Sequence, residues 1–474
     1  MLRRRLFSFF SVLTLCSVLF GQGCTRGPDA ATASASKRVE INMWGVIDDV
    51  DVYNDILKEY HALHPNVTIN FRRLRLEEYE DELLNALAED KGPDVFMVHN
   101  SWVSKYESKI APMPLTTKVA VQRVVGTVKK ETVYVLENQP TISVRKYKDA
   151  YPEAVAADTI RTVNVSTIVD ERKLEQRVMA MPLSVDTLGL YVNKDLLNAA
   201  GIATVPRTWD AFQTTVPRLV KQDSQGELIQ SAASFGTGYN VEREPDIVAA
   251  LMMQNGTEMV AEDGSPTFAL LPPALSSQRE EPPAFQALSF YTDFANPAKS
   301  VYSWNDKQPN SLDSFIQGRS AYFLGYSYHL PVIRSRAPKL NLGISSLPQI
   351  DGNPIVNYAN YWNWTVSKKT KSTEIAWNLI NFMIQPDQAK KYLDAAGRPA
   401  ADKSLLEAQL EDEEVGVFAS QVLTAKSWYR GQDPQAMEDA FQAMVDNVLK
   451  GVEEIPTAVR NAQSKVSQTV RFNF

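Results

Sequence analysis

The chain has 474 residues, an unbiased composition and a formal net charge of −7 at neutral pH. This length is about three times that of an average single domain, so we expect at least two domains with ample buried core. The mildly negative charge argues against nucleic acid and against an anionic membrane face as partners.

The first 24 residues have the parts of a bacterial secretion signal. Basic residues 3–5 precede an apolar stretch, residues 6–20, which is too short for a comfortable membrane span, and Gly23-Cys24 follows. A small residue before a cysteine resembles a lipobox, although Gly21 stands where leucine is usual. We therefore expect residues 1–24 to be a lipoprotein signal peptide with a lipidated Cys24. Plain cleavage near the same place is the alternative.

Removal of the signal would leave Cys24 as the only cysteine, which excludes an intramolecular disulfide. Residues 25–37 are rich in Ala, Ser and Thr and predict a flexible tether. Two or three acyl chains on Cys24 would give stable anchoring. We thus expect an extracytoplasmic protein, held to the cell membrane by lipid on the periplasmic side or the cell surface.

Residues 39–98 predict strands that alternate with helices. Residues 39–44 and 67–71 alternate in hydropathy and residues 94–98 are apolar, as strands are, while the segments between them have helical periodicity. The order β-α-β-α-β predicts a parallel, doubly wound sheet. Ligands of such sheets bind beyond the carboxyl ends of the strands.

Two of these strand ends combine an aromatic ring with hydrogen-bonding groups, as sugar binding requires. The candidate ligand-binding residues there are Asp48, Asp49, Asn100, Ser101 and Trp102. Asp48 and Asp49 could instead only cap the next helix. His61 and His64 have no third ligand nearby, so we expect solvated surface rather than a metal site.

Residues 179–202, Met-Ala-Met-Pro-Leu-Ser-Val-Asp-Thr-Leu-Gly-Leu-Tyr-Val-Asn-Lys-Asp-Leu-Leu-Asn-Ala-Ala-Gly-Ile, predict a strand, a polar break, a second strand and a capped helix ended by Gly201. Such an order suits a chain that crosses between two lobes. The run closely resembles a hallmark of the bacterial family 1 extracellular solute-binding proteins, the sugar-binding components of ABC importers. Further resemblance covers most of residues 38–474.

This resemblance implies an α/β fold of the periplasmic-binding-protein-like type II, with two doubly wound lobes joined by a multi-strand hinge. We expect an N-terminal lobe of residues 38–185 and 348–405 and a C-terminal lobe of residues 186–347 and 406–474. Residues 112–178 give no functional prediction, although 145–161 look helical.

More candidate ligand-binding residues lie in the hallmark, at later strand ends and in later loops. They are Asp186, Tyr239, Trp304, Tyr326, Tyr328, Tyr361, Trp362 and Trp428. Relatives lend an aromatic ring to the sugar after the strand predicted at 321–325, which favours Tyr326 and Tyr328. Trp304 could instead pack as a lid, and Asp186 could brace the hinge. Tyr361 and Trp362 lie on opposite faces of a strand predicted at 358–367.

By resemblance, the protein is a monomeric receptor and not an enzyme, without cofactor or metal. It would bind a carbohydrate, an oligosaccharide or glycoside, between its lobes and deliver it to an ABC transporter permease. A polyamine, iron or a peptide as ligand is one alternative. The other, a secreted glycoside hydrolase, needs two carboxylates about 5 Å or about 6.5–9.5 Å apart. No sequence signature joins Asp48, Asp49 and Asp186 into such a pair.

Overall fold

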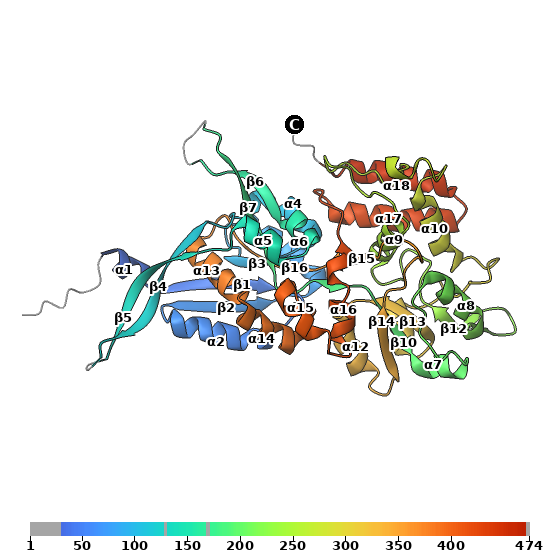
Figure 1. Ribbon diagram of the computed structural model, residues 1–474, viewed down its shortest axis with the longest axis horizontal. Helices are drawn as coiled ribbons and strands as arrows, with labels where there is room; N and C mark the ends of the chain where they lie inside the picture. The colour runs from blue at the N-terminus through green and yellow to red at the C-terminus, as the bar shows by residue number, and fades with distance from the viewer. Residues whose placement is uncertain (1–29, 128–129, 167–170, 471–474) are drawn as a thin grey trace, which may run out of the picture.

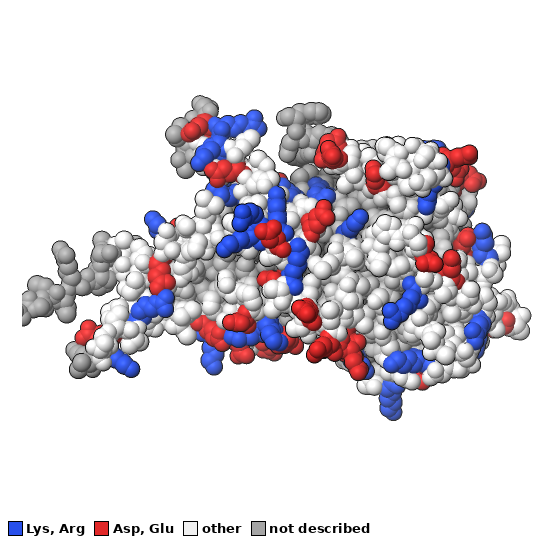
Figure 2. Space-filling view, viewed as in Figure 1, with Lys and Arg blue, Asp and Glu red and all other residues white. Residues whose placement is uncertain are grey.

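The computed structural model describes residues 30–127, 130–166 and 171–470, which form two α/β lobes side by side along the long axis (Figure 1). The expected signal peptide and Cys24 lie outside the described residues. Acidic and basic side chains are interspersed over the face in Figure 2, without a large area of one sign. Within the described ranges, no helix combines the length and the apolar character that a membrane span needs.

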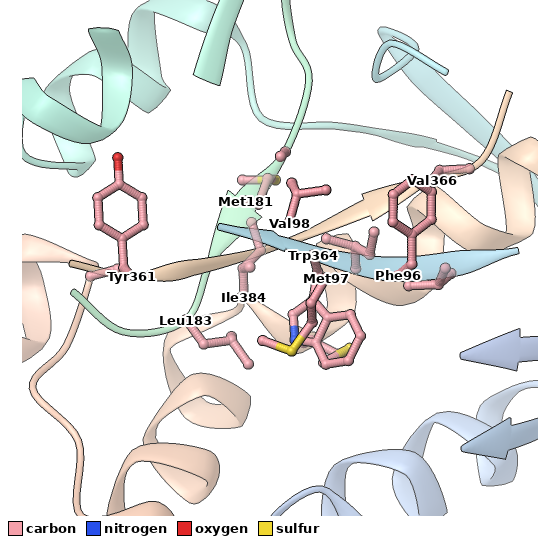
Figure 3. Close-up of a cluster of buried hydrophobic side chains, with 14 of the residues drawn as sticks. Phe96, Met97, Val98, Met181, Leu183, Tyr361, Trp364, Val366 and Ile384 are labelled. Atoms are coloured by element: carbon pink, nitrogen blue, oxygen red, sulfur yellow. The ribbon is translucent and has the colours of Figure 1, made fainter. Parts of the chain in front are cut away.

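The first lobe is built on a sheet with the strand order β2-β1-β3-β16-β8. Its strands are β1 (Val39–Gly45), β2 (Val67–Arg73), β3 (Val95–His99), β8 (Met181–Pro182) and β16 (Trp362–Val366). β1 is parallel to β2 and β3, as predicted, whereas β16 runs antiparallel to β3. Met97 and Trp364 are direct partners in that pairing and lie together on one side of the sheet (Figure 3).

The helices of the first lobe include the two predicted between the strands of residues 39–98. They are η1 (Val50–Val52), α2 (Asn54–Leu63), α3 (Leu76–Ala88), η2 (Asn100–Trp102), α4 (Val103–Tyr106), η3 (Glu107–Lys109), α13 (Thr373–Met383), α14 (Pro386–Ala396), α15 (Lys403–Gln409) and α16 (Val415–Ala419). Tyr79 ties α3 to β3, because its hydroxyl donates a 2.7 Å hydrogen bond to the Met97 carbonyl.

The second lobe is built on a sheet with the order β11-β12-β13-β10-β14. Its strands are β10 (Gly189–Asn193), β11 (Lys221–Gln222), β12 (Leu228–Ala233), β13 (Ser320–Gly325) and β14 (Leu342–Ser346). β10 runs antiparallel to both β13 and β14, and β12 is parallel to β13, so this sheet is mixed. β14 forms one edge of this sheet.

Helices cover the second sheet and extend the lobe. They are α7 (Lys194–Ala199), α8 (Trp209–Leu219), α9 (Glu244–Gln254), η4 (Pro273–Leu275), α10 (Pro283–Asp293), α11 (Ser311–Ile316), α12 (His329–Arg336), α17 (Pro434–Leu449) and α18 (Ile455–Ser467). The short helix η5 (Val422–Thr424) instead packs on the first core through Val422. Asn193 caps α7 by accepting hydrogen bonds from two backbone amides, and Gly201 ends this segment with a φ of 69°.

A small sheet with the order β17-β15-β9 forms the hinge. It contains β9 (Asp186–Thr187), β15 (Asn357–Asn360) and β17 (Ala425–Lys426). The single strand predicted at 358–367 is therefore two strands, divided at Tyr361 between the hinge and the first lobe. Ile350, expected in the first lobe, packs on the second core, and Leu406, expected in the second lobe, belongs to the first core.

Residues 112–178 form two hairpins that project from the first lobe (Figure 1). One is β4 (Thr116–Val125) with β5 (Glu131–Pro140), and the other is β6 (Ile160–Asn164) with β7 (Leu174–Val178). The helix predicted at 145–161 is two helices, α5 (Val144–Ala150) and α6 (Glu153–Thr159). Pro152 explains the division, because the residue before a proline disfavours the helical conformation.

Two further predictions for the first lobe are wrong. The tether expected at 25–37 contains a helix, α1 (Ala30–Ala35), which packs against β4 and β5. His64 was expected in solvent but is 3% exposed, and its Nδ1 lies 2.8 Å from the Ala120 carbonyl oxygen. Both follow from the β4–β5 hairpin, which covers this end of the lobe and which the pattern of residues 112–178 did not reveal.

Candidate ligand-binding cleft

A cavity of about 470 Å³ lies between the two lobes. This volume falls within the range of roughly 300–1,000 Å³ that is usual for small-molecule sites. The first lobe lines it with β3, α3 and β16, and the second lobe with the start of α9, the turn after β13 and the start of α17. Its lining residues include His99, Trp102, Lys105, Glu242, Arg243, Tyr328, Asn360, Trp362 and Glu438.

Aromatic rings form the first-lobe wall of this cavity. Trp102 and Trp362 meet edge to face with ring centroids 5.2 Å apart, and His99 lies 5.4 Å from Trp362. Pairing of β3 with β16 sets this arrangement, because it places His99 directly opposite Trp362. Two of the predicted candidates, Trp102 and Trp362, are thereby brought together at one wall.

His99, which the sequence analysis missed, is held as a neutral imidazole. Asn360 donates its amide hydrogens to Asp246, so its Oδ1 accepts from His99 Nε2 at 3.3 Å. His99 Nδ1 then accepts from the Ser101 hydroxyl at 2.8 Å. Burial, assisted by nearby Arg243, lowers the pKa of His99 to about 4. Its signal in the sequence was its position directly after the strand predicted at residues 94–98.

Asn100 and Ser101 lie behind the wall rather than on it. Both side chains are buried. Asn100 donates to Asp158 over 3.3 Å, and Ser101 orients His99. These two candidates therefore support the site from outside the cavity.

Tyr328 forms the second-lobe wall, and Tyr326 supports it from behind. Tyr326 stacks on Tyr328 at 5.5 Å and donates a 2.7 Å hydrogen bond from its hydroxyl to Asp246. Burial raises the pKa of both phenols, so they are neutral donors. Tyr328 lines the cavity, whereas Tyr326 is fully buried.

A charged network at the start of α9 completes this wall, and the sequence analysis missed it. Arg243 lies 2.8 Å from both Asp246 and Glu438, and Asn360 donates to Asp246 over 3.1 Å. Burial opposes ionisation of Asp246, but Arg243 and the hydrogen bonds outweigh it and hold the pKa of that carboxyl below its ordinary value. Asp246 therefore stays ionised beside Arg243 at neutral pH.

A second cavity of about 30 Å³ adjoins the first and shares Tyr328, Asn360 and Trp362 with it. This volume is about that of one water molecule. Asp48, Asp186 and Tyr361, three of the predicted candidates, line this small cavity. They are thus close to the main cavity but at its narrow end.

The polar groups of the small cavity bind one another. Arg398 forms a 2.9 Å ion pair with Asp48, while the Ser327 hydroxyl donates to Asp186 over 2.6 Å. Burial raises the pKa of Asp186, although Arg398 and the hydrogen bonds from Ser327 oppose this. Tyr361 donates to the buried Asp158 over 2.6 Å. Few hydrogen-bonding groups remain here for a ligand.

The four remaining candidates lie outside both cavities and away from their walls. Asp49 accepts from the Val50 amide at the start of η1 and pairs with Arg73 at 3.3 Å. Tyr239 is 65% exposed on the surface of the second lobe. Trp304 and Trp428 are buried in the second core, where large rings gain more from packing than from contact with a polar cleft.

Two lobes, a hinge sheet and a cavity between them define a two-lobed receptor. The family model described as bacterial extracellular solute-binding protein matches residues 47–390. The chain belongs to this family, which confirms the inference from residues 179–202.

The chain is similar to several known members. A binding protein of Brucella abortus is 20% identical over 352 residues, 73% of this chain and 71% of the relative. The multiple sugar-binding protein of Streptococcus mutans is 25% identical over 50% of this chain and 54% of the relative. The GacH receptor of Streptomyces glaucescens, solved unliganded and with acarbose, superposes with a TM-score of 0.66 at 17% identity, over 91% of this chain and 99% of that one. This likeness confirms the predicted fold.

Proposed function

We propose that this protein is a receptor for a carbohydrate, an oligosaccharide or glycoside, which it binds in the larger cavity. The observation that carries the proposal is the placing of Trp102 and Trp362 on one lobe opposite Tyr328 on the other, with the polar side chains of Asn360, Arg243 and Glu438 in the same lining. Such rings stack on the C–H faces of sugars, and the polar groups bind hydroxyls. The sugar-binding relatives named above support this ligand class.

Ligand binding would couple to lobe closure, because the walls of the cavity come from both lobes and from the hinge. A ligand that contacts both walls stabilises the closed arrangement relative to an open one. We propose that the closed receptor then delivers its ligand to an ABC permease, and that a lipid on Cys24 holds it at the outer face of the membrane. We further propose that it acts as a monomer, because one chain supplies both walls of the larger cavity.

The test is isothermal titration of the mature protein with an oligosaccharide panel, comparing Trp102→Ala with Trp304→Phe. A ring of about 150–250 Å² that buries half its area gains on the order of 2–3 kcal/mol. We therefore expect Trp102→Ala to weaken binding at least tenfold. Trp304→Phe, in the second core, lowers the melting temperature and leaves affinity unchanged. Equal affinity in the wild type and Trp102→Ala would contradict the site.

A second measurement tests the role of a receptor. Labelled oligosaccharide incubated with the protein should be recovered intact, because the structure offers Asp48 and Asp186 only as hydrogen-bonded or ion-paired groups in the narrow cavity. Turnover of the sugar would replace the receptor proposal with a hydrolase.

A further inference from the structure

The larger cavity carries an excess of negative charge. Its lining contains five carboxylates against two basic side chains, which leaves three negative charges. The carboxylates are Glu77, Glu80, Asp81, Glu242 and Glu438, and the basic residues are Lys105 and Arg243. Low-dielectric walls focus the field of such a set on whatever occupies the cavity.

Both basic groups are already neutralised by protein carboxylates. Lys105 lies 2.6 Å from Glu80, and Arg243 lies 2.8 Å from both Asp246 and Glu438. His99 adds no positive charge, because burial keeps its imidazole neutral. A negatively charged ligand would therefore find no uncommitted cation among the described residues that line the cavity.

The remaining carboxylates have no such partner. Among the described residues, no Lys or Arg forms an ion pair with Glu77, Asp81 or Glu242. Glu242 is nonetheless ionised, because its neighbour His329, with Nε2 4.0 Å away, and a 3.0 Å hydrogen bond from Asn310 lower its pKa. Glu77 and Asp81 follow one another around the first turns of α3, at the mouth of the cavity. The uncompensated charge thus comes from both lobes.

We propose that the ligand of this cleft is an amino-substituted carbohydrate that carries a protonated amine. The inference rests on the proposed function and names its ligand class more closely. An ammonium group between the lobes compensates the negative charge of the carboxylates on both walls. The faces of Trp102, Trp362 and Tyr328 attract this cation and also stack on the sugar ring. The same field disfavours uronic acids and sugar phosphates, because it repels their negative charge.

Carboxylates also accept hydrogen bonds from neutral hydroxyls, so the test must isolate charge. The probes are pairs of oligosaccharides that differ only in whether C2 of each sugar carries an amine or a hydroxyl, such as the β-1,4-linked glucosamine trisaccharide and cellotriose, with galacto-configured pairs alongside. Titration is carried out at a pH below the pKa of the amine. We expect the amine of a pair to bind at least tenfold more tightly than the hydroxyl, which corresponds to about 1.4 kcal/mol.

Ionic strength and substitution give two independent measurements of the electrostatic attraction between the amine and the cavity. The preference should shrink as ionic strength rises from about 0.1 M to about 1 M, where the Debye length falls from about 10 Å to about 3 Å. The double variant Glu77→Gln, Asp81→Asn should lose at least fivefold in affinity for the amine-bearing oligosaccharide of a pair. It should lose less than twofold in affinity for the hydroxyl-bearing one. Glu89→Gln, in the exposed residue that follows α3, is the matched control and should change neither.

The outcomes separate this inference from the proposed function. If the two oligosaccharides of every pair bind equally, or the hydroxyl-bearing one binds more tightly, the inference is wrong. The proposed function as a carbohydrate receptor is then unaffected. Binding of spermidine with no response to any sugar overturns the carbohydrate claim. Binding of no member of the panel overturns both.

Discussion

The two cavities between the lobes are made from the same kinds of residue but differ in how their charges are used. In the small cavity, Arg398 is committed to Asp48, and Asp186 is committed to Ser327. In the large cavity, three carboxylates form no ion pair with a Lys or Arg among the described residues, and the aromatic rings of both lobes face open space. The difference indicates that the residues around the small cavity hold the lobes together, whereas the large cavity is available to a ligand.

The largest expected effect is a loss of folding stability in Arg398→Met, which removes the buried ion pair of the small cavity. Removing one member of a buried ion pair costs about 3–5 kcal/mol, because the other charge stays buried without compensation. Asp48 and Asp186 would both lose their cation. Urea unfolding of the mature protein measures the loss.

Arg334→Met is the matched control, because Arg334 pairs with Glu414 on the exposed surface. Such exposed pairs contribute about 0–1 kcal/mol. If the two arginine variants lost equal stability, the small cavity would not be the structural element described above.

A smaller effect is expected at the wall of the large cavity, in the pH dependence of His99. The unfolded chain takes up a proton at His99 near its ordinary pKa of about 6.5, whereas the folded protein does so only at about 4. The unfolded state therefore binds more protons within this window, and stability falls as the pH is lowered through it, by up to about 3 kcal/mol. In His99→Gln this part of the decline should disappear. An unchanged pH profile between pH 6.5 and 4 would show that the folded ring is protonated normally.

The smallest effect is expected at Glu244, at the start of α9. Its contribution to the pH dependence of stability has the opposite sign to that of His99. Its side chain is fully buried, and neither carboxylate oxygen has a hydrogen-bond partner among the described residues. Burial, then repulsion from Asp246 and Glu438, raises its pKa well above the ordinary value. The folded state therefore holds this proton to higher pH, and stability falls as the pH rises above about 4.3, the unfolded value.

Glu244→Met should remove that decline and gain about 1–2 kcal/mol at neutral pH, since it replaces an unsatisfied buried polar group by an apolar one. Thermal unfolding at pH 5 and pH 8 gives the slope in both proteins. A loss of stability in the variant at pH 8 would mean that the carboxylate has a partner that stabilises its charge.

Much of the fold could be predicted because its signals are local. The alternation of residues 39–44, the apolar run at 94–98 and the cap at Asn193 depend on neighbours in the chain, and the hallmark at 179–202 indicated two lobes. The hairpins of residues 112–178 were not predictable, because their strands pair across polar surface without a clean period.

The site was predicted less well, because cavity contact depends on tertiary packing. Trp102, Tyr328 and Trp362 line the cavity, but Trp304 and Trp428 have the same chemistry and lie in the core. Sequence alone does not show which way a ring points. Arg243 and Glu438 were missed because they are far apart in the chain and meet only when α17 packs against α9.

The helix α1 changes the reach of the proposed lipid anchor. An unstructured tether through residue 37 could extend over at most roughly 50 Å, at about 3.5 Å per residue. With Ala30–Ala35 packed on the β4–β5 hairpin, and Asn66 donating to the Ala35 and Lys37 carbonyls, the span between Cys24 and the folded body is limited to roughly 20 Å. A receptor on so short a tether would stay within a thin layer above the membrane surface. This confinement raises its effective concentration at a permease in the same membrane. Its first lobe, not its second, would be the part kept nearest the lipid.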